Sequence, residues 1–201
     1  MEDPGELRAA TTDAYDRLAG VWAADTESNL WNEHLERPAV RSLLPPDLRG
    51  LSILDAGCAG GSHASWMLER GAQVTGVDLS AEMVRAAMTR TGGRGRFVVA
   101  DLAEPLPLDD NHFDGIVCSL TLHYLRDLDV PLGSFASVLR PGGWLILSSD
   151  HPGGPWKGSP RPDSFATELL TDRWTKAGVT VEQSFWRRPL QDTVEALARA
   201  G

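Results

Sequence analysis

The stretch LSILDAGCAGGSHASWMLER, residues 51–70, decides the fold. Its first five residues form a short apolar run that ends in Asp55, which is typical of a buried strand. A glycine-rich turn follows, and residues 62–70 have the pattern of a helix. Glycines at such a turn let a ligand approach the backbone closely, and the first N–H groups of the helix are free to bind it. The stretch therefore predicts a strand, a ligand-binding turn and a helix.

The same alternation continues towards the C-terminus. Short apolar runs predict strands at residues 73–78, 97–100, 113–119 and 143–149, and helical patterns predict helices at residues 80–90 and 130–139. Strands that alternate with helices form βαβ units, and right-handed crossovers then favour an α/β fold with a doubly wound, mostly parallel sheet. Open sheets of this kind bind ligands at the carboxyl ends of their strands.

The glycine-rich turn does not fit a nicotinamide dinucleotide. Such a site needs Gly-x-Gly-x-x-Gly, and counting from Gly57 the other two places hold Ala59 and Ser62. The pattern that fits is Asp-x-Gly-x-x-x-Gly, through Asp55, Gly57 and Gly61.

Three acids end three successive predicted strands. Asp55 suits an ammonium group, Asp78 can accept hydrogen bonds from both hydroxyls of a ribose, and Asp101 can accept one from an exocyclic adenine amine. Each aspartate alone is explained as a helix cap or a turn residue. Together, beside the glycine-rich turn, they predict a site for a cationic ligand that carries ribose and adenine.

Several motifs then appear in an order that resembles the class I S-adenosylmethionine-dependent methyltransferases, in the small-molecule branch that includes the ubiquinone- and menaquinone-type enzymes. The resemblance covers roughly residues 11–200. It implies a Rossmann-like sheet of strand order 3-2-1-4-5 and the cofactor S-adenosylmethionine, which leaves as S-adenosylhomocysteine. The motifs are Tyr15-Asp16-x-x-Ala19, Leu54-Asp55-Ala56-Gly57-Cys58, Val77-Asp78-Leu79-Ser80, Ala100-Asp101-Leu102, Phe113-Asp114, Leu122-His123-Tyr124-Leu125 and Leu139-Arg140-Pro141-Gly142-Gly143.

The resemblance also implies a role for each matching position. The methionine moiety is expected to contact Asp55, Ala56, Gly57, Cys58 and Gly61. The ribose is expected at Asp78, and the adenine between Leu79, Met83, Asp101 and Leu102. Ser119 is expected under the sulfonium, with Tyr15 closing over the cofactor. Ala59 stands where many relatives have glycine, so a positive φ there would strain the turn.

Two histidines are candidate general bases, if the molecule that accepts the methyl group must lose a proton. His123 and His151 follow predicted strands on the ligand side of the sheet. The alternative for His123 is a positioning role in the cofactor pocket, and the alternative for His151 is a turn before Pro152. Arg187 or Arg188 could hold an acidic group of the acceptor.

We expect one methyltransferase domain over residues 1–201. It divides into an N-terminal helical lid at 1–48, a cofactor-binding core at 49–150, and a substrate cap with a last helix at 151–201. The cap is predicted to be a loop followed by one strand at 178–186. In the resembling family an antiparallel hairpin completes the central sheet, and that hairpin is expected to be missing here. The exposed edge of the fifth strand is then covered by residues 151–190 or paired in a homodimer.

Composition narrows the partners and the compartment. The formal net charge of −9 offers no overall basic excess for nucleic acid, so we expect a small-molecule substrate. No stretch approaches the ~18 apolar residues that span a bilayer. Two cysteines without metal spacing suit a reducing cytoplasm, and no metal site is expected. The alternative function is a non-catalytic, regulatory protein that binds S-adenosylmethionine on the same fold.

Overall fold

A computed structural model describes residues 4–153, 163 and 165–201, without the side chains of Pro4 and residues 22–28. Its centre is a five-stranded sheet in the order β3-β2-β1-β4-β5, with every pair of neighbours parallel. The predicted α/β fold and strand order are therefore confirmed. The strands are β1 (Ser52–Ala56), β2 (Gln73–Asp78), β3 (Arg96–Val99), β4 (Phe113–Ser119) and β5 (Leu139–Ser148).

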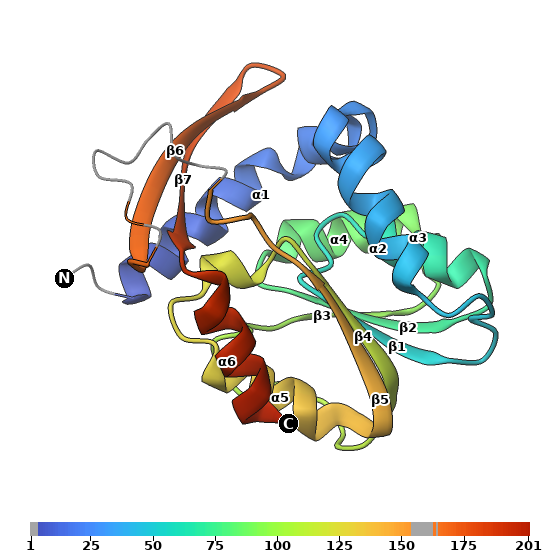
Figure 1. Cartoon of the computed structure of the whole chain (residues 1–201). Coiled ribbons are helices and arrows are strands. Elements are labelled where there is room, and N and C mark those ends of the chain that lie inside the picture. The colour runs from blue at the N-terminus through green and yellow to red at the C-terminus, as the bar shows by residue number, and fades with distance from the viewer. Residues whose placement is uncertain (1–3, 154–162, 164) are drawn as a thin grey trace.

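Helices cover both faces of this sheet, as a mostly parallel sheet requires. Figure 1 shows α2, α3 and α4 above it and α5 and α6 below it. All five residues of β1 are buried, because Ile53 points into the core beneath α2 and α3 while Leu54 points into the core against α5 and α6. The helices are α2 (Arg37–Leu43), α3 (Ser62–Glu69), α4 (Ala81–Arg90), α5 (Asp129–Val138) and α6 (Leu190–Ala200).

The N-terminal segment is helical, as expected, and is interrupted by a bend at Asn29. Helix α1 (Pro4–Ser28) is followed by a single π-helical turn, η1 (Asn32–Glu36), and then by α2. Helix α1 packs against the start of α4, where the Ser80 hydroxyl donates a hydrogen bond to the carboxylate of Asp16. Ser80 also caps α4, since its side chain accepts a hydrogen bond from the Met83 N–H.

The cap segment differs from the prediction. Instead of one strand it contains two, β6 (Glu168–Lys176) and β7 (Val179–Arg187), which pair as an antiparallel hairpin. Ala177 and Gly178 join them with φ values of 46° and 84°, the left-handed pair that a tight two-residue hairpin turn needs. This hairpin is a separate two-stranded sheet before α6 and does not extend the central sheet, which keeps five strands.

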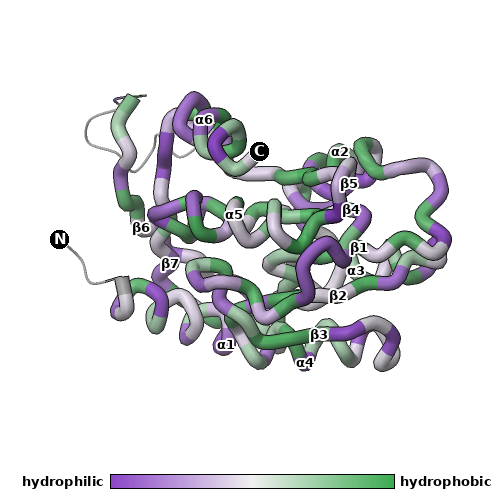
Figure 2. Tube along the Cα trace, turned by 90° about the horizontal axis from the view of Figure 1, so that it is seen from below, coloured by the Kyte–Doolittle hydropathy of each residue, from purple (hydrophilic) through white to green (hydrophobic). Residues whose placement is uncertain are grey.

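The hairpin packs on α1 and not along the exposed edge of β5. Ala14 and Leu18 of α1 form a small core with Val181 of β7. In Figure 2 the hairpin and α1 lie together at one end of the molecule, while β3 and β5 mark the two edges of the sheet. Among the described strands only β4 pairs with β5, so the expected covering of this edge is not provided by the hairpin. Residues 154–162 and 164 of the cap lie outside the described residues.

Candidate functional site

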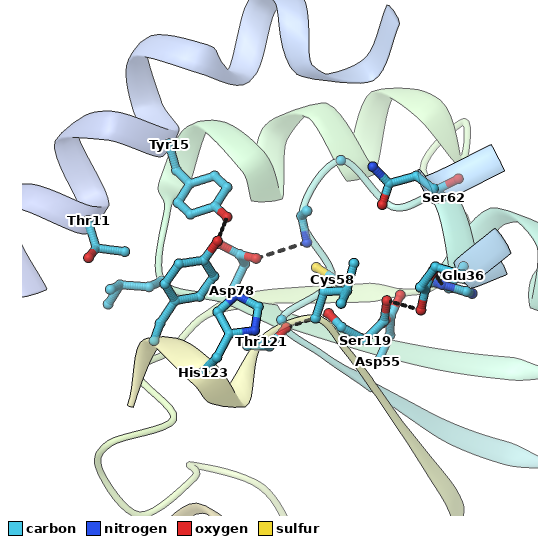
Figure 3. Close-up of a pocket in the computed structure, with 18 of the residues that line it drawn as sticks. Thr11, Tyr15, Glu36, Asp55, Cys58, Ser62, Asp78, Ser119, Thr121 and His123 are labelled. Carbon is cyan, nitrogen blue, oxygen red and sulfur yellow. Dashed lines mark hydrogen bonds and ion pairs between the residues drawn. The ribbon is translucent and has the colours of Figure 1, made fainter. Parts of the chain in front are cut away.

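A cavity of about 600 Å³ lies over the carboxyl ends of β1, β2 and β4, roofed by the N-terminal helices and the turn end of the hairpin. Figure 3 shows acids and hydroxyls from these strand ends pointing into it. Most of the predicted site residues line this cavity. They are Tyr15, Asp55, Gly57, Cys58, Asp78, Leu79, Asp101, Leu102, Ser119 and His123.

Four predicted residues do not line the cavity. Ala56 and Met83 are buried in the protein. Gly61 serves packing, because a Cβ there would lie 2.9 Å from the Cα of Ala87 on α4. His151 is exposed, and its Nδ1 accepts a hydrogen bond from the Gly153 N–H, as a turn residue does.

The turn after β1 holds the backbone close to the cavity. Gly57 has a φ of 77°, and a Cβ at this position would lie 2.2 Å from the Thr121 Oγ1. Only glycine therefore fits. Ala59 has a φ of 44°, so the strain expected at this position is present in the structure. Its N–H donates a hydrogen bond to the Asp78 carboxylate at 2.8 Å, which ties the strained residue to the end of β2.

Asp55 is the most unusual acid of the site. Its side chain is buried, and its Oδ2 has no hydrogen-bond partner among the described residues. Burial raises its pKa to about 6, against the lowering effects of the nearby His63 and of a hydrogen bond from the Ala64 N–H. A buried carboxylate oxygen without a partner is costly, and a cation or donor supplied by a ligand would offset that cost.

Asp78 and Asp101 present acceptors further along the same edge. Asp78 Oδ1 accepts a hydrogen bond from the Ser80 N–H at 2.9 Å, and burial raises the pKa of the group. Asp101 pairs with Arg8 of α1 at 2.5 Å and accepts a hydrogen bond from the Ala103 N–H. Each carboxylate has further lone pairs for a ligand.

Two tyrosines close the cavity from the side of α1. The Tyr15 hydroxyl donates a hydrogen bond to the Tyr124 hydroxyl at 2.6 Å, and their rings meet edge to face. Beside them His123 is buried, and its Nδ1 has no partner in the described part of the chain. Burial lowers the pKa of His123 to about 4, so the imidazole is neutral at pH 7. A neutral imidazole has one nitrogen that can accept a hydrogen bond.

Glu36 lines the cavity and was not predicted by the sequence analysis. Glu36 enters the cavity from η1, and its Oε1 accepts hydrogen bonds from the Ser119 and Ser148 hydroxyls at 2.6 and 2.7 Å. Its Oε2 lies 3.4 Å from the Nε2 of His63. A glutamate in a helical stretch gives no sequence signal for contacts with strands more than 80 residues away.

The cations that the sequence suggested for an acidic acceptor group are engaged elsewhere. Arg187 is buried and donates hydrogen bonds to Glu168 and to the Asp163 carbonyl, while Arg188 donates to the Leu125 carbonyl. The basic residues that line the cavity are different, and four of them are Arg37, Arg90, Arg173 and Lys176.

The comparisons with known proteins point to one family. Residues 54–147 match the family described as "Methyltransferase domain". The malonyl-[acyl-carrier protein] O-methyltransferase of Pseudescherichia vulneris is 41% identical over 134 residues, which are 66% of this chain and 53% of that protein. The ubiquinone biosynthesis O-methyltransferase of Chromobacterium violaceum is 31% identical over 145 residues, 68% of this chain and 61% of that protein.

A solved structure agrees over most of the chain. The S-adenosylmethionine-dependent methyltransferase of Mesorhizobium loti superposes with a TM-score of 0.66 and 28% identity, covering 85% of this chain and 82% of that one. The chain spans only about half to three fifths of the length of the two curated relatives named above.

Replacing Asp55 with asparagine is expected to stabilise the ligand-free protein. Because the folded pKa lies above the unfolded value of 3.8, the folded state binds more protons, and stability falls as pH rises through roughly 4 to 6. Asp55→Asn removes this loss, so its free energy of unfolding should exceed the wild-type value by about 1–3 kcal/mol at pH 7.5 and by less at pH 5. Urea unfolding at both pH values measures the difference.

The control for this prediction is Asp109→Asn, which changes an exposed aspartate and should leave the unfolding free energy within about 0.5 kcal/mol of the wild type. An Asp55→Asn protein that is less stable at pH 7.5 would show that the buried carboxylate is satisfied in the ligand-free fold.

Proposed function

We propose that the chain, whose residues 54–147 match a methyltransferase domain family, binds S-adenosylmethionine and transfers its methyl group to a small-molecule acceptor. The observation that carries the proposal is the buried Asp55 carboxylate, which lacks a partner for Oδ2 among the described residues and stands in line with Asp78 and Asp101. This row of acids matches a ligand with an ammonium group, a ribose and an adenine.

The residues present fit that cofactor. We propose that Asp55 pairs with the ammonium group, that Asp78 accepts hydrogen bonds from the ribose, and that Asp101 and Leu102 flank the adenine. Gly57 has no side chain at a place where a Cβ would collide with Thr121. When bound, the cofactor supplies a methyl group on a positively charged sulfur. The protein's part is to orient that group towards an acceptor and to exclude water, with Tyr15 and Tyr124 closing one side.

We propose a hydroxyl or carboxyl oxygen as the acceptor. The two curated relatives named above are O-methyltransferases, and an acceptor hydroxyl must lose its proton during transfer. We propose that His123 receives this proton, because its side chain lines the cavity.

No described helix is long and apolar enough to cross a membrane. Both cysteines are free and buried, which suits our proposal of a cytoplasmic location.

The proposal predicts cofactor affinity that depends on Asp78. Calorimetry should show binding of S-adenosylmethionine and S-adenosylhomocysteine but not of NAD. Asp78→Ala should weaken binding of both by about 1–3 kcal/mol, the loss of a charge-assisted hydrogen-bond acceptor. Asp109→Ala, at an exposed site outside the cavity, should bind like the wild type. Binding of NAD instead, or an unchanged affinity in a folded Asp78→Ala protein, would refute the assignment.

His123 is predicted to affect turnover more than cofactor affinity. His123→Ala should keep the affinity for S-adenosylhomocysteine and lower kcat on a hydroxyl acceptor by about 10²–10⁴-fold, the usual contribution of a general base. The assay follows transfer of a labelled methyl group over a panel of small hydroxyl and carboxyl compounds. His34→Ala, at an exposed histidine, is the control. Full activity of His123→Ala would mean that positioning alone drives transfer.

We further propose that two copies pair through the edge of β5. Leu145 and Leu147 on this strand are only half-buried, and β4 is the one described strand that pairs with β5. Light scattering should report a mass twice that of the chain, and amides of residues 144–148 should lose protection from hydrogen exchange on dilution. A monomer at all concentrations would contradict the pairing.

A further inference from the structure

Glu36 joins the ends of two strands to the N-terminal segment. Its side chain is only 10% exposed, and a single oxygen, Oε1, accepts hydrogen bonds from both Ser119 at the end of β4 and Ser148 at the end of β5. Figure 3 shows Glu36 beside Ser119 and Asp55, at the opposite end of the cavity from Tyr15. Glu36 is also the last residue of a π-helical turn, a rare geometry that is frequent at functional sites.

The charge of Glu36 is fixed at neutral pH. Burial alone would raise its pKa, but the hydrogen bond and the charge of His63, together with the two serine hydroxyls, lower the pKa to about 2. His63 is the one ion-pair partner within 4.0 Å among the described residues, and it is charged only when protonated. Glu36 is thus a permanent negative charge and too weak a base to take a proton from an acceptor.

This charge determines what the serines can offer a ligand. Both hydroxyl protons are donated to Glu36, so neither is available as a donor. The Ser148 Oγ accepts a hydrogen bond from the Leu120 N–H, whereas the Ser119 Oγ lines the cavity. The wall at the end of β4 therefore presents a serine oxygen lone pair, backed by the nearly buried Glu36 carboxylate. Such a wall attracts a positive charge and repels an anion.

If S-adenosylmethionine binds as proposed, the sheet order would bring its transferable methyl group near this wall. If Asp55 on β1 takes the ammonium group and Asp78 on β2 takes the ribose, the ends of β4 and β5 on the other side of β1 are left for the reactive group and the acceptor. We propose that Glu36, acting through Ser119, makes the cavity prefer the positively charged S-adenosylmethionine over the neutral S-adenosylhomocysteine. This inference rests on the proposed function and assigns Glu36 as a specificity-determining residue.

The consequence for the reaction follows from the charge balance. Transfer moves the bonding electron pair onto sulfur and the methyl group onto the acceptor, so the positive charge on sulfur disappears. The field of Glu36 then no longer favours the bound product. Glu36 should therefore promote exchange of product for fresh cofactor, and its removal should strengthen product inhibition.

Calorimetry on the full chain tests the inference without relying on activity. Glu36→Gln keeps the size of the side chain and an oxygen to accept from Ser119 and Ser148, but removes the charge. The affinity for S-adenosylmethionine should fall about tenfold more than the affinity for S-adenosylhomocysteine. The control is Glu69→Gln, at an exposed glutamate that also accepts a serine hydrogen bond, and it should change neither affinity.

The possible results separate the inference from the function beneath it. A wild-type protein that binds neither ligand would refute the proposed function. A wild type that binds both, with a Glu36→Gln protein that loses the two affinities equally or not at all, would refute only the role of Glu36. If Glu36→Gln does not fold, Glu36→Asp, which retains the charge on a shorter side chain, must keep the wild-type affinity ratio, and loss of that ratio would overturn the inference.

Discussion

The buried carboxylate of Asp55 is the interaction on which the site depends. It stands at the end of β1, the central strand, where every residue is buried and β2 and β4 pair on either side. Its Oδ2 has no partner among the described residues, which is unfavourable for folding, and a bound ligand would offset that cost. The geometry around it follows from the parallel sheet, which brings the ends of β2 and β4, and with them Asp78 and Ser119, to the same edge.

Parts of the chain that are distant in sequence complete the site. Helix α1 reaches it through Tyr15, which contacts Tyr124, and the bond between Asp16 and Ser80 fixes the helix near the end of β2. The π-helical turn reaches it through Glu36, and the hairpin lies on α1 with its turn end over the cavity. These three elements enclose the cavity that the strand ends would otherwise leave open to water.

The sequence predicted those parts of the structure that local patterns encode. The strand at residues 73–78 and the glycine turn are visible because buried parallel strands are apolar and Gly57 must take a positive φ. Asp55, Asp78 and Asp101 were predicted from their places at strand ends, and all three line the cavity. Glu36 could not be found this way, since its partners lie 83 and 112 residues further along the chain. The first strand of the hairpin was missed because its charged and polar residues interrupt the apolar pattern that predicts a strand.

The Asp55 carboxylate is expected to lose its bound proton when the ammonium group of a ligand reaches it. Calorimetric titration with S-adenosylmethionine at pH 6, in two buffers of different ionisation enthalpy, measures protons released on binding. A pKa of about 6 in the free protein predicts release of roughly half a proton per site at pH 6 and less at pH 7.5, because the bound ammonium group favours the ionised carboxylate. Binding with no proton release at pH 6 would contradict the claim.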